Sequence, residues 1–274
     1  MIKKIVILGA GRYAEVLLNV IASPEERERG IEVVATHRRA ERRAEVERKF
    51  GIPVLADNRE ACRDADMIYP LVRPEQMAGL MEEIGPCIQE DQIFAVGAAA
   101  IPLAFYRRYL EANCALAWVF PPPFITTRTG YLAINPEPGI DAQKLDELKG
   151  YWSRFCDQVL IVGDGALDSF TVLHACGQFF LYPVIKAMIA YGESNGLTRE
   201  DAQAISLGTL RCTAQALSSI ECSQENLEAK LDRARVPGNM TNAGLKVLDA
   251  AATEDTFARC FAAAHHQAEV NRNR

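Results

Sequence analysis

The sequence predicts an α/β N-terminal domain with a mainly parallel sheet, followed by an all-α C-terminal domain. Three observations carry this prediction. A glycine turn at residues 9–14 stands between an apolar strand pattern and a helical one, short β-branched runs alternate with helical patterns up to about residue 160, and the texture is helical from about Asp164 onward. Strands that alternate with helices over such a length form βαβ units. We therefore expect one domain over residues 1–163 and a second over residues 164–274.

The elements of the first domain follow one another closely. Residues 3–9 (KKIVILG) form a buried-strand pattern, and residues 11–23 form the helix after it. A second strand is expected at residues 31–36, before a charged helix at Ala40–Phe50. The remaining expected elements are strands at Ile52–Leu55, Met67–Leu71, Ile93–Val96 and Leu116–Phe120 and a helix at Pro74–Ile84.

The second domain is expected to consist of helices. Leu173–Gly192 is a long apolar run, and Thr198 followed three residues later by Asp201 resembles a capping box at the start of the next helix. The run is about as long as a membrane span, but it contains His174, Gln178, Pro183 and Lys186. We therefore favour a helix buried in a subunit or domain interface over a membrane helix. The apolar positions at 202–217 continue the helix that begins at this capping box, and further helices are expected at 226–235, 243–252 and 255–267.

Composition narrows the class of protein. The chain has 274 residues, of which 49% are hydrophobic and 24% charged, values typical of a soluble globular protein. A formal net charge of -6 argues against a general nucleic-acid-binding protein, which would carry a basic surface. The eight cysteines form no C-x-x-C pair and the four histidines lack zinc-like spacing, so we expect no metal site. Reduced thiols in apolar surroundings, behind an N-terminus without a cleavage site, favour a cytoplasmic location.

The first motif with chemical meaning is Gly9-Ala10-Gly11-Arg12-Tyr13-Ala14. It follows a strand and opens a helix, as a Rossmann dinucleotide fingerprint requires. Gly9 permits the tight turn, Gly11 lets the backbone approach a pyrophosphate, and Ala14 packs the helix on the sheet. The free N–H groups at the helix start favour the phosphate charge. A dinucleotide cofactor is therefore expected here.

The end of the second strand indicates which dinucleotide binds. The strand ends in Thr36-His37-Arg38-Arg39, without the acid that usually binds the ribose hydroxyls of NAD. A hydroxyl and a guanidinium can instead bind a 2′-phosphate, so the sequence favours NADP(H). Arg38 is the first candidate, before Arg39 and Arg12. Six Arg or Lys against three Glu lie between residues 36 and 49, and a solvated helix face is the alternative explanation, especially for Arg42, Arg43 and Arg48.

These motifs resemble the pyrroline-5-carboxylate reductase family. The resemblance includes residues 9–15, Thr36-His37-Arg38, Asp57-Asn58, the segment 72–76 (VRPEQ) and the Ala95–Ala100 stretch. Near the C-terminus, residues 236–241 (VPGNMT) and 243–245 (AGL) are similar to the family signature. The resemblance covers nearly the whole chain in the right order.

The resemblance implies an N-terminal Rossmann domain and a helical domain that interlocks with a second subunit as a homodimer. It also implies that NADPH reduces a small cyclic imino acid, in the last step of proline synthesis. The cofactor residues that we expect are Gly9, Gly11, Arg12, Tyr13, Ala14, Thr36, His37, Arg38, Asn58, Val72, Arg73 and Pro74.

The chain departs from the family pattern where substrate would bind. The family's Ser-Gly-Ser-Gly-Pro-Ala loop corresponds to residues 174–179 (HACGQF), and its Pro-Gly-Gly-Thr-Thr stretch to residues 237–241 (PGNMT). Residues 120–124 (FPPPF) lack the asparagine of the family's Met-Pro-Asn-x-Pro stretch. A changed substrate, or a weakened or lost parent activity, is therefore expected. The expected substrate-binding residues are His174, Cys176, Gly177, Gly238, Asn239 and Thr241.

Two side chains are candidates for catalysis. Thr241 corresponds to the family threonine that is placed to hydrogen-bond the imine nitrogen. His174 can donate a proton or bind an anion near neutral pH, although a core histidine is the alternative. Cys176 as a reactive thiol has only His174 as a nearby base. Two other functions stay open: reduction of a different imine or a carbonyl with His174 as proton donor, and NADP(H) binding without turnover.

Overall fold

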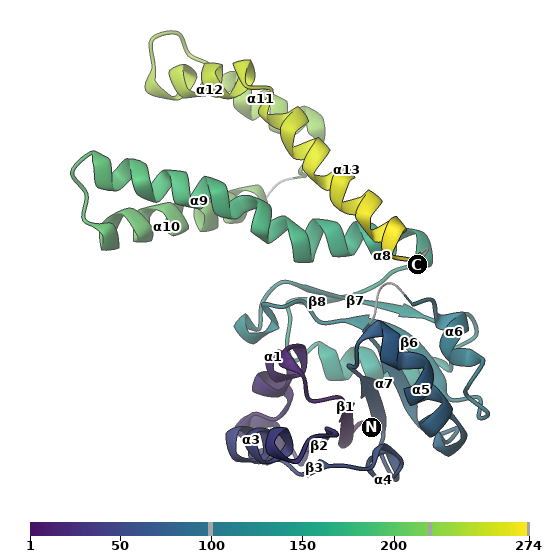
Figure 1. The fold of residues 1–274 in the computed structure, drawn as a ribbon. Helices are drawn as coiled ribbons and strands as arrows, with labels where there is room; N and C mark the ends of the chain where they lie inside the picture. The colour runs from purple at the N-terminus through teal and green to yellow at the C-terminus, as the bar shows by residue number, and fades with distance from the viewer. Residues whose placement is uncertain (98–100, 219–220, 273–274) are drawn as a thin grey trace. The chain divides into compact units, whose positions relative to one another are not determined.

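One eight-stranded sheet organises the N-terminal part of the chain (Figure 1). The computed structural model describes residues 1–97, 101–218 and 221–272, so residues 98–100 of the Ala95–Ala100 stretch lie outside the described residues. The strand order is β3-β2-β1-β4-β5-β6-β7-β8. The strands are β1 (Lys4–Leu8), β2 (Glu32–Thr36), β3 (Val54–Leu55), β4 (Met67–Pro70), β5 (Ile93–Val96), β6 (Ala115–Phe120), β7 (Tyr131–Pro136) and β8 (Gln158–Ile161).

All neighbouring strands are parallel except β6 and β7, which confirms the predicted mainly parallel sheet. The sequence did not predict β7, β8 or the helix α7 (Ala142–Trp152) between them. Gly130 has a positive φ just before β7, and Pro136 ends that strand. Gly and Pro are turn signals in a sequence, so they obscured the strand between them.

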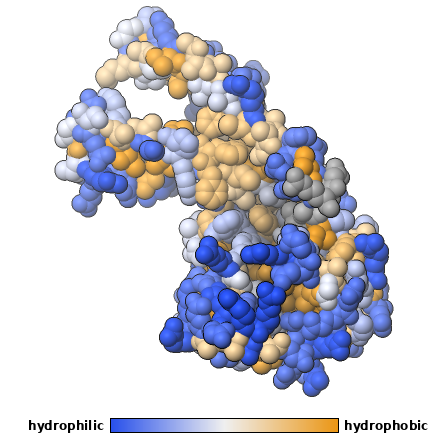
Figure 2. All heavy atoms as spheres, in the orientation of Figure 1, coloured by the Kyte–Doolittle hydropathy of each residue, from blue (hydrophilic) through white to orange (hydrophobic). Residues whose placement is uncertain are grey.

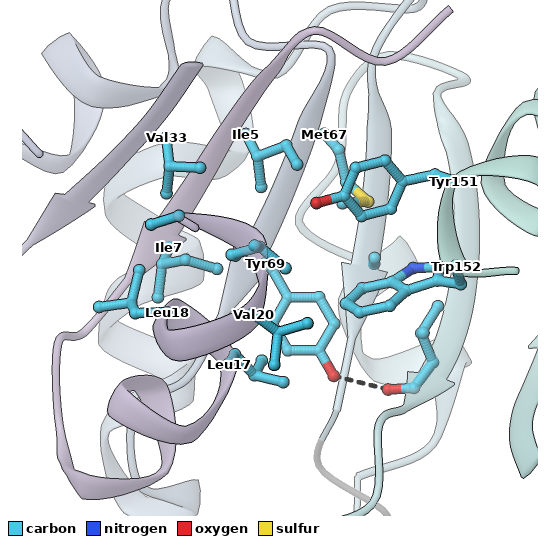
Figure 3. Packing of buried hydrophobic residues seen from close by; sticks show 14 of the residues in the cluster. Ile5, Ile7, Leu17, Leu18, Val20, Val33, Met67, Tyr69, Tyr151 and Trp152 are labelled. Carbon is cyan, nitrogen blue, oxygen red and sulfur yellow. Dashed lines mark hydrogen bonds between the residues drawn. The ribbon is translucent and has the colours of Figure 1, made fainter. Parts of the chain in front are cut away.

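Both faces of the sheet are covered, so successive residues of one strand enter different cores. Ile5 and Ile7 of β1 pack with Trp152 of α7 and with α1 (Arg12–Ile21) on one face (Figure 3). Val6 and Leu8 pack with α5 (Pro74–Ile84) on the other face. A strand that is buried on both sides has a continuous apolar run, which explains the pattern KIVIL. The other helices of this part are α2 (Pro24–Glu28), α3 (Ala40–Phe50), α4 (Asn58–Cys62) and α6 (Leu103–Arg107).

The rest of the chain is helical. α8 (Asp164–Phe170) continues through a π-helical turn at Thr171–Cys176 into α9 (Gly177–Ser194). The helices α10 (Arg199–Ser218), α11 (Gln224–Ala234), α12 (Met240–Ala250) and α13 (Thr253–Arg272) follow. Contacts divide the chain into one unit of Met1–Ala175 with His265–Arg274 and another of Cys176–Ala264.

Helix α9 exposes many large apolar side chains. Phe179 is 51% exposed and Tyr191 is 71% exposed, and Leu181, Tyr182 and Val184 are exposed as well (Figure 2). By length and composition alone, the helical stretch Asp164–Ser194 could cross a membrane. The same composition suits a soluble helix that another protein surface covers, because water-exposed apolar patches of this kind mark contact sites.

Candidate functional site

The carboxyl ends of β1, β2 and β4 meet at one cavity of about 830 Å³. The register pairs Leu8 with Thr36 on one side and with Pro70 on the other, so the loops after these three strands lie next to one another. The order of the strands reverses between β1 and β4, which is where open α/β sheets bind ligands. The lining residues are Gly9, Gly11, Thr36, His37, Arg38, Arg39, Ala56, Asn58, Leu71, Val72, Arg73, Glu75, Gln76, Leu80 and Glu83.

The turn after β1 requires glycine at its first position. Gly9 has a φ of 98°, and a Cβ there would lie 2.9 Å from Val72 Cγ1 and 3.2 Å from the Leu71 carbonyl oxygen. The next residue is held from both sides, because the Ala10 N–H donates to the Thr36 carbonyl at 2.8 Å and the Ala10 carbonyl accepts from Arg42 Nε at 3.0 Å. The turn is therefore fixed without any ligand.

The start of helix α1 is open to an anion. Gly11 is the N-cap residue of α1 and supplies no side chain to the free N–H groups of the first turn. A Cβ on Gly11 would meet no protein atom within 4 Å, so the space beside this residue is free for a ligand. Unpaired N–H groups at a helix start and the positive end of the helix dipole together favour phosphate.

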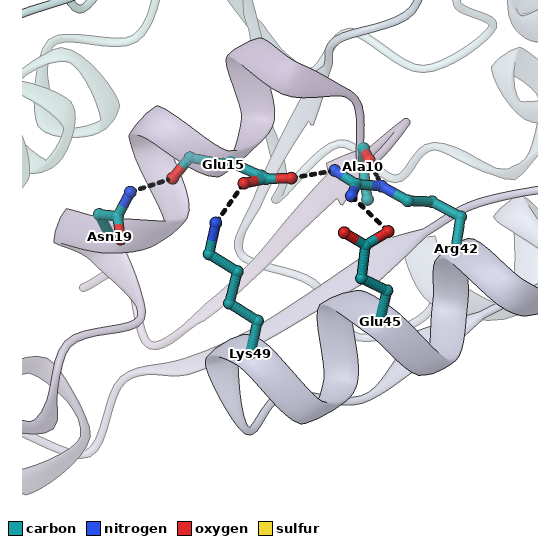
Figure 4. A network of polar contacts seen from close by, with 6 residues as sticks. All are labelled: Ala10, Glu15, Asn19, Arg42, Glu45 and Lys49. Carbon is teal, nitrogen blue, oxygen red and sulfur yellow. Dashed lines mark hydrogen bonds and ion pairs between the residues drawn. The ribbon is translucent and has the colours of Figure 1, made fainter.

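The basic residues after β2 separate into two groups. Arg42 forms ion pairs with Glu15 and Glu45, and Lys49 pairs with the same Glu15 carboxylate (Figure 4). The hydrogen bonds from Lys49 and Arg42 lower the pKa of Glu15, which keeps this carboxylate charged. Arg42 and Lys49 are therefore neutralised by carboxylates of the protein, and the Arg42 side chain is only 12% exposed, so it does not belong to a solvated helix face.

Arg38 and Arg39 remain free at the cavity. Both side chains are exposed, both line the cavity, and neither has an ion-pair partner among the described residues. Arg43 is not free, because its Nη1 donates to the carbonyls of His37 and Arg38 at 3.0 Å each. These hydrogen bonds support the loop after β2. The cavity therefore offers two unpaired guanidinium groups on its β2 side.

His37 is a neutral neighbour of these guanidiniums. Its Nδ1 accepts the Arg39 N–H at 3.2 Å. Desolvation, with a smaller contribution from the nearby arginines, lowers the pKa of His37. Because Nδ1 accepts the Arg39 N–H, a neutral ring would carry its proton on Nε2.

The predicted cofactor residues that do not line the cavity have structural places. Tyr13 Oη donates to the Pro121 carbonyl at 2.5 Å, which ties α1 to the chain after β6. Ala14 is buried against the sheet, Arg12 is exposed, and Pro74 begins α5. The other eight predicted cofactor residues meet at the cavity.

The sequence reasoning missed the face that α5 turns to the cavity. Gln76, Leu80 and Glu83 are spaced four and three residues apart, so they share one side of the helix. The helical spacing from Gln76, the last residue of the VRPEQ segment, would have pointed to Leu80 and Glu83. Glu83 is also hydrogen-bonded to Asn58, whose Nδ2 donates to both of its carboxylate oxygens at 3.2 and 3.1 Å.

His174 lies in the π-helical turn and packs among aromatic rings. The centroid of its ring lies 4.8 Å from the ring centroid of Phe124, 5.3 Å from that of Phe170 and 5.9 Å from that of Tyr131. Its Nε2 accepts the backbone N–H of Tyr131 at 3.1 Å, so the neutral ring carries its proton on Nδ1. Desolvation lowers the pKa of His174. His174 is therefore a half-buried ring that packs on three aromatic side chains, with Nε2 occupied by the backbone.

The remaining predicted substrate residues belong to the second unit, Cys176–Ala264. Gly177 is buried at the start of α9, and Cys176 is partly exposed. Gly238, with a φ of 84°, precedes the N-cap residue Asn239, whose Oδ1 accepts the Asn242 N–H at 2.6 Å. Thr241 is exposed in the first turn of α12.

Comparison with known proteins shows similarity to two family models, which cover different parts of the chain. Residues 164–270 match the family described as pyrroline-5-carboxylate reductase dimerisation, and residues 4–95 match NADP oxidoreductase coenzyme F420-dependent. The pyrroline-5-carboxylate reductase of Pseudomonas aeruginosa is 25% identical over 250 residues, covering 90% of this chain and 89% of the relative. That of Corynebacterium melassecola is 24% identical over 268 residues, covering 97% of each chain.

A solved structure shows the same fold. The NADP-bound pyrroline carboxylate reductase of Plasmodium falciparum superposes with a TM-score of 0.83 at 17% identity, covering 99% of this chain and 98% of the other. The two-part architecture and the family resemblance that the motifs indicated are thereby confirmed.

Proposed function

We propose that this chain, a divergent member of the pyrroline-5-carboxylate reductase family, is an NADPH-dependent reductase of a small cyclic imino acid. The observation that carries the proposal is the cavity, where an uncapped helix start and two unpaired guanidiniums lie at the switch point of the sheet. The relatives that match over nearly the whole chain bear the name of this reductase.

The residues at the cavity fit NADP(H) in two separate places. The first turn of α1 and the open side of Gly11 suit the pyrophosphate, which NAD and NADP share. Arg38 and Arg39 suit the 2′-phosphate, which NADP alone has, because a guanidinium binds phosphate oxygens in pairs. Bound NADPH would supply the hydride for the carbon of the C=N bond.

The protein has little proton chemistry to perform in such a reaction. A protonated iminium is already electrophilic, so holding it in the right orientation supplies much of the catalysis. Thr241 is the residue that we expect to hydrogen-bond the imine nitrogen, and its exposed hydroxyl has no hydrogen-bond partner in the described part of the chain. Gly238 and Asn239, at the start of α12, are further residues that we expect to contact the substrate, as are His174, Cys176 and Gly177.

The aromatic setting of His174 favours imine over carbonyl reduction. A proton donor for a carbonyl would need a ring nitrogen that faces substrate and a pKa near the working pH. Nε2 of His174 instead accepts a backbone N–H, and burial lowers its pKa. We assign His174 a structural role that shapes the substrate loop.

A homodimer through the C-terminal helices completes the proposal. The match to a dimerisation family over residues 164–270 and the exposed apolar side chains of α9 both support it. The eight free cysteines support a reducing, cytoplasmic setting.

The proposal is tested by steady-state oxidation of NADPH with pyrroline-5-carboxylate and a panel of other cyclic imino acids and ketones. We expect turnover with at least one imino acid and none with the ketones. Turnover of ketones alone would replace the imine by a carbonyl substrate. Tight NADPH binding without turnover of any compound would show a nucleotide-binding protein that has lost catalysis.

A further inference from the structure

We infer that Glu83 is a positioning residue for the phosphate-binding turn, and that it acts through Asn58 and Thr36 on the N–H of Gly9. The same chain of hydrogen bonds removes the Thr36 hydroxyl from the possible ligands of a 2′-phosphate. This inference rests on the proposed NADPH function of the cavity, and it assigns a role to a carboxylate that the fingerprint does not include.

Glu83 sets the donor-to-acceptor direction of this series of hydrogen bonds. An ionised carboxylate can only accept hydrogen bonds, and the two Oε atoms lie 3.2 and 3.1 Å from Asn58 Nδ2. The NH₂ group of Asn58 must therefore face Glu83. Its carbonyl oxygen, Oδ1, must then face the other way, toward Thr36.

The next link follows from the atoms that meet. Asn58 Oδ1 lies 2.7 Å from Thr36 Oγ1, and an amide oxygen cannot donate. The single hydroxyl proton of Thr36 is therefore committed to Asn58. Thr36 Oγ1 is left to accept, and it accepts the Gly9 N–H at 3.2 Å.

Burial makes this arrangement hard to replace. Thr36 is only 2% exposed, so water cannot take over the bonds of its hydroxyl. Its carbonyl also accepts the Ala10 N–H, so Thr36 holds two successive N–H groups of the turn. Gly9 is packed closely against Val72, so a small shift of this turn would move the loop on which a pyrophosphate would rest.

Glu83 is itself held in place at the end of α5. Arg59 Nε donates to the Glu83 carbonyl at 2.9 Å, and the Arg59 N–H is bound by the Asp57 carboxylate that caps α4. The route therefore runs from α5 through α4 and β2 to the turn after β1. It holds a loop that would touch the pyrophosphate, which both nucleotides share, whereas Arg38 and Arg39 would touch only the 2′-phosphate of NADP.

The inference is tested by the affinities of NADPH and NADH for matched variants. Thr36→Val keeps the shape and removes the hydroxyl, so we expect both affinities to fall by the same factor, about tenfold for one lost buried hydrogen bond. Thr36→Ser should keep both affinities. Loss of NADPH affinity alone in Thr36→Val would overturn the inference, because it would make the hydroxyl a direct ligand of the 2′-phosphate.

Variants of Glu83 test the origin of the effect. Glu83→Ala should weaken both nucleotides equally, whereas Glu83→Gln keeps an oxygen that accepts from Asn58 and should restore most of the affinity. Glu82→Ala, at the exposed neighbouring position, is the control and should change nothing. Equal affinities for wild type and Glu83→Ala would contradict the role of Glu83.

The Gly9 amide gives a readout that needs no ligand. In amide NMR spectra of the ligand-free protein, its signal should shift in Glu83→Ala and return in Glu83→Gln. In the wild type this amide should be protected from hydrogen exchange, and fast exchange would contradict the chain of bonds even if a variant fails to fold. If the wild type binds neither nucleotide, the proposed function fails, while this measurement still decides on the hydrogen-bond chain.

Discussion

Replacing Arg38 by alanine tests the cofactor assignment most sharply, because the change should affect one nucleotide and spare the other. Arg38 lines the cavity, is exposed and has no ion-pair partner in the described residues. Nothing in the fold depends on its guanidinium, so the variant should keep the melting temperature of the wild type. Arg43, by contrast, supports the loop carbonyls and is not suited to this experiment.

The magnitude follows from the exposure of the side chain. A hydrogen bond to a charged group contributes about 1.5–3 kcal/mol, and the lower end applies to an exposed guanidinium. About 1.4 kcal/mol corresponds to a tenfold change in affinity, so we expect NADPH to bind about tenfold more weakly. The double variant Arg38→Ala/Arg39→Ala should weaken NADPH about a hundredfold if the two contributions add. NADH, which has no 2′-phosphate, should bind almost unchanged.

The assay is a calorimetric titration of each variant with NADPH and with NADH at two salt concentrations. The preference of the wild type for NADPH should shrink at high salt, because screening shortens the reach of exposed charges to about 3 Å at 1 M. Arg48→Ala, on the exposed surface of α3 and outside the cavity, controls for the loss of one positive charge. Equal losses for NADPH and NADH in Arg38→Ala would refute the reasoning and place the 2′-phosphate elsewhere.

Three further predictions concern the turn, the histidine and the helices. Gly9→Ala should destabilise the fold by about 1–3 kcal/mol because of its positive φ and its close neighbours, whereas Gly11→Ala should keep the melting temperature and weaken both nucleotides in titrations. Because the folded state lowers the pKa of His174 below its ordinary value of 6.5, stability should decrease as the pH falls through that value. His174→Phe should lose this part of the pH dependence in urea unfolding and still turn over substrate, and complete inactivity would restore the proton-donor role. Leu181→Glu/Tyr182→Lys should be monomeric in sedimentation at micromolar concentration, and an intact dimer would contradict the role of α9.

The sequence predicts the strand, turn and helix around the glycine motif because the signals for these elements are local. The turn at Gly9, the strand before it and the helix after it occupy one short segment, and the fingerprint fixes their geometry. The residues at the end of β2 could be related to this turn because neighbouring parallel strands end at the same edge of the sheet, which places Thr36 beside Leu8. Several basic residues follow β2 in the sequence. The structure was needed to show that Glu15 neutralises two of them, Arg42 and Lys49.

The missing parts depend on contacts between distant segments. Glu83 is 25 residues from Asn58, and no local pattern links a carboxylate on α5 to an amide on α4. His174 meets the Tyr131 N–H across 43 residues, so its role as an acceptor could not be distinguished from catalysis in the sequence. Strands β7 and β8 are bounded by turn residues, and they pair with each other and with β6 across segments that are distant in the sequence.

The proposed hydride transfer from NADPH to a C=N bond can be followed by an isotope label. The purified protein is incubated with pyrroline-5-carboxylate or a related cyclic imino acid and with NADPH deuterated at the transferring position of the nicotinamide. We expect mass spectrometry to detect a saturated cyclic amino acid that carries one deuterium on the former imine carbon. Tight binding of NADPH without deuterium in any product would contradict the proposed transfer.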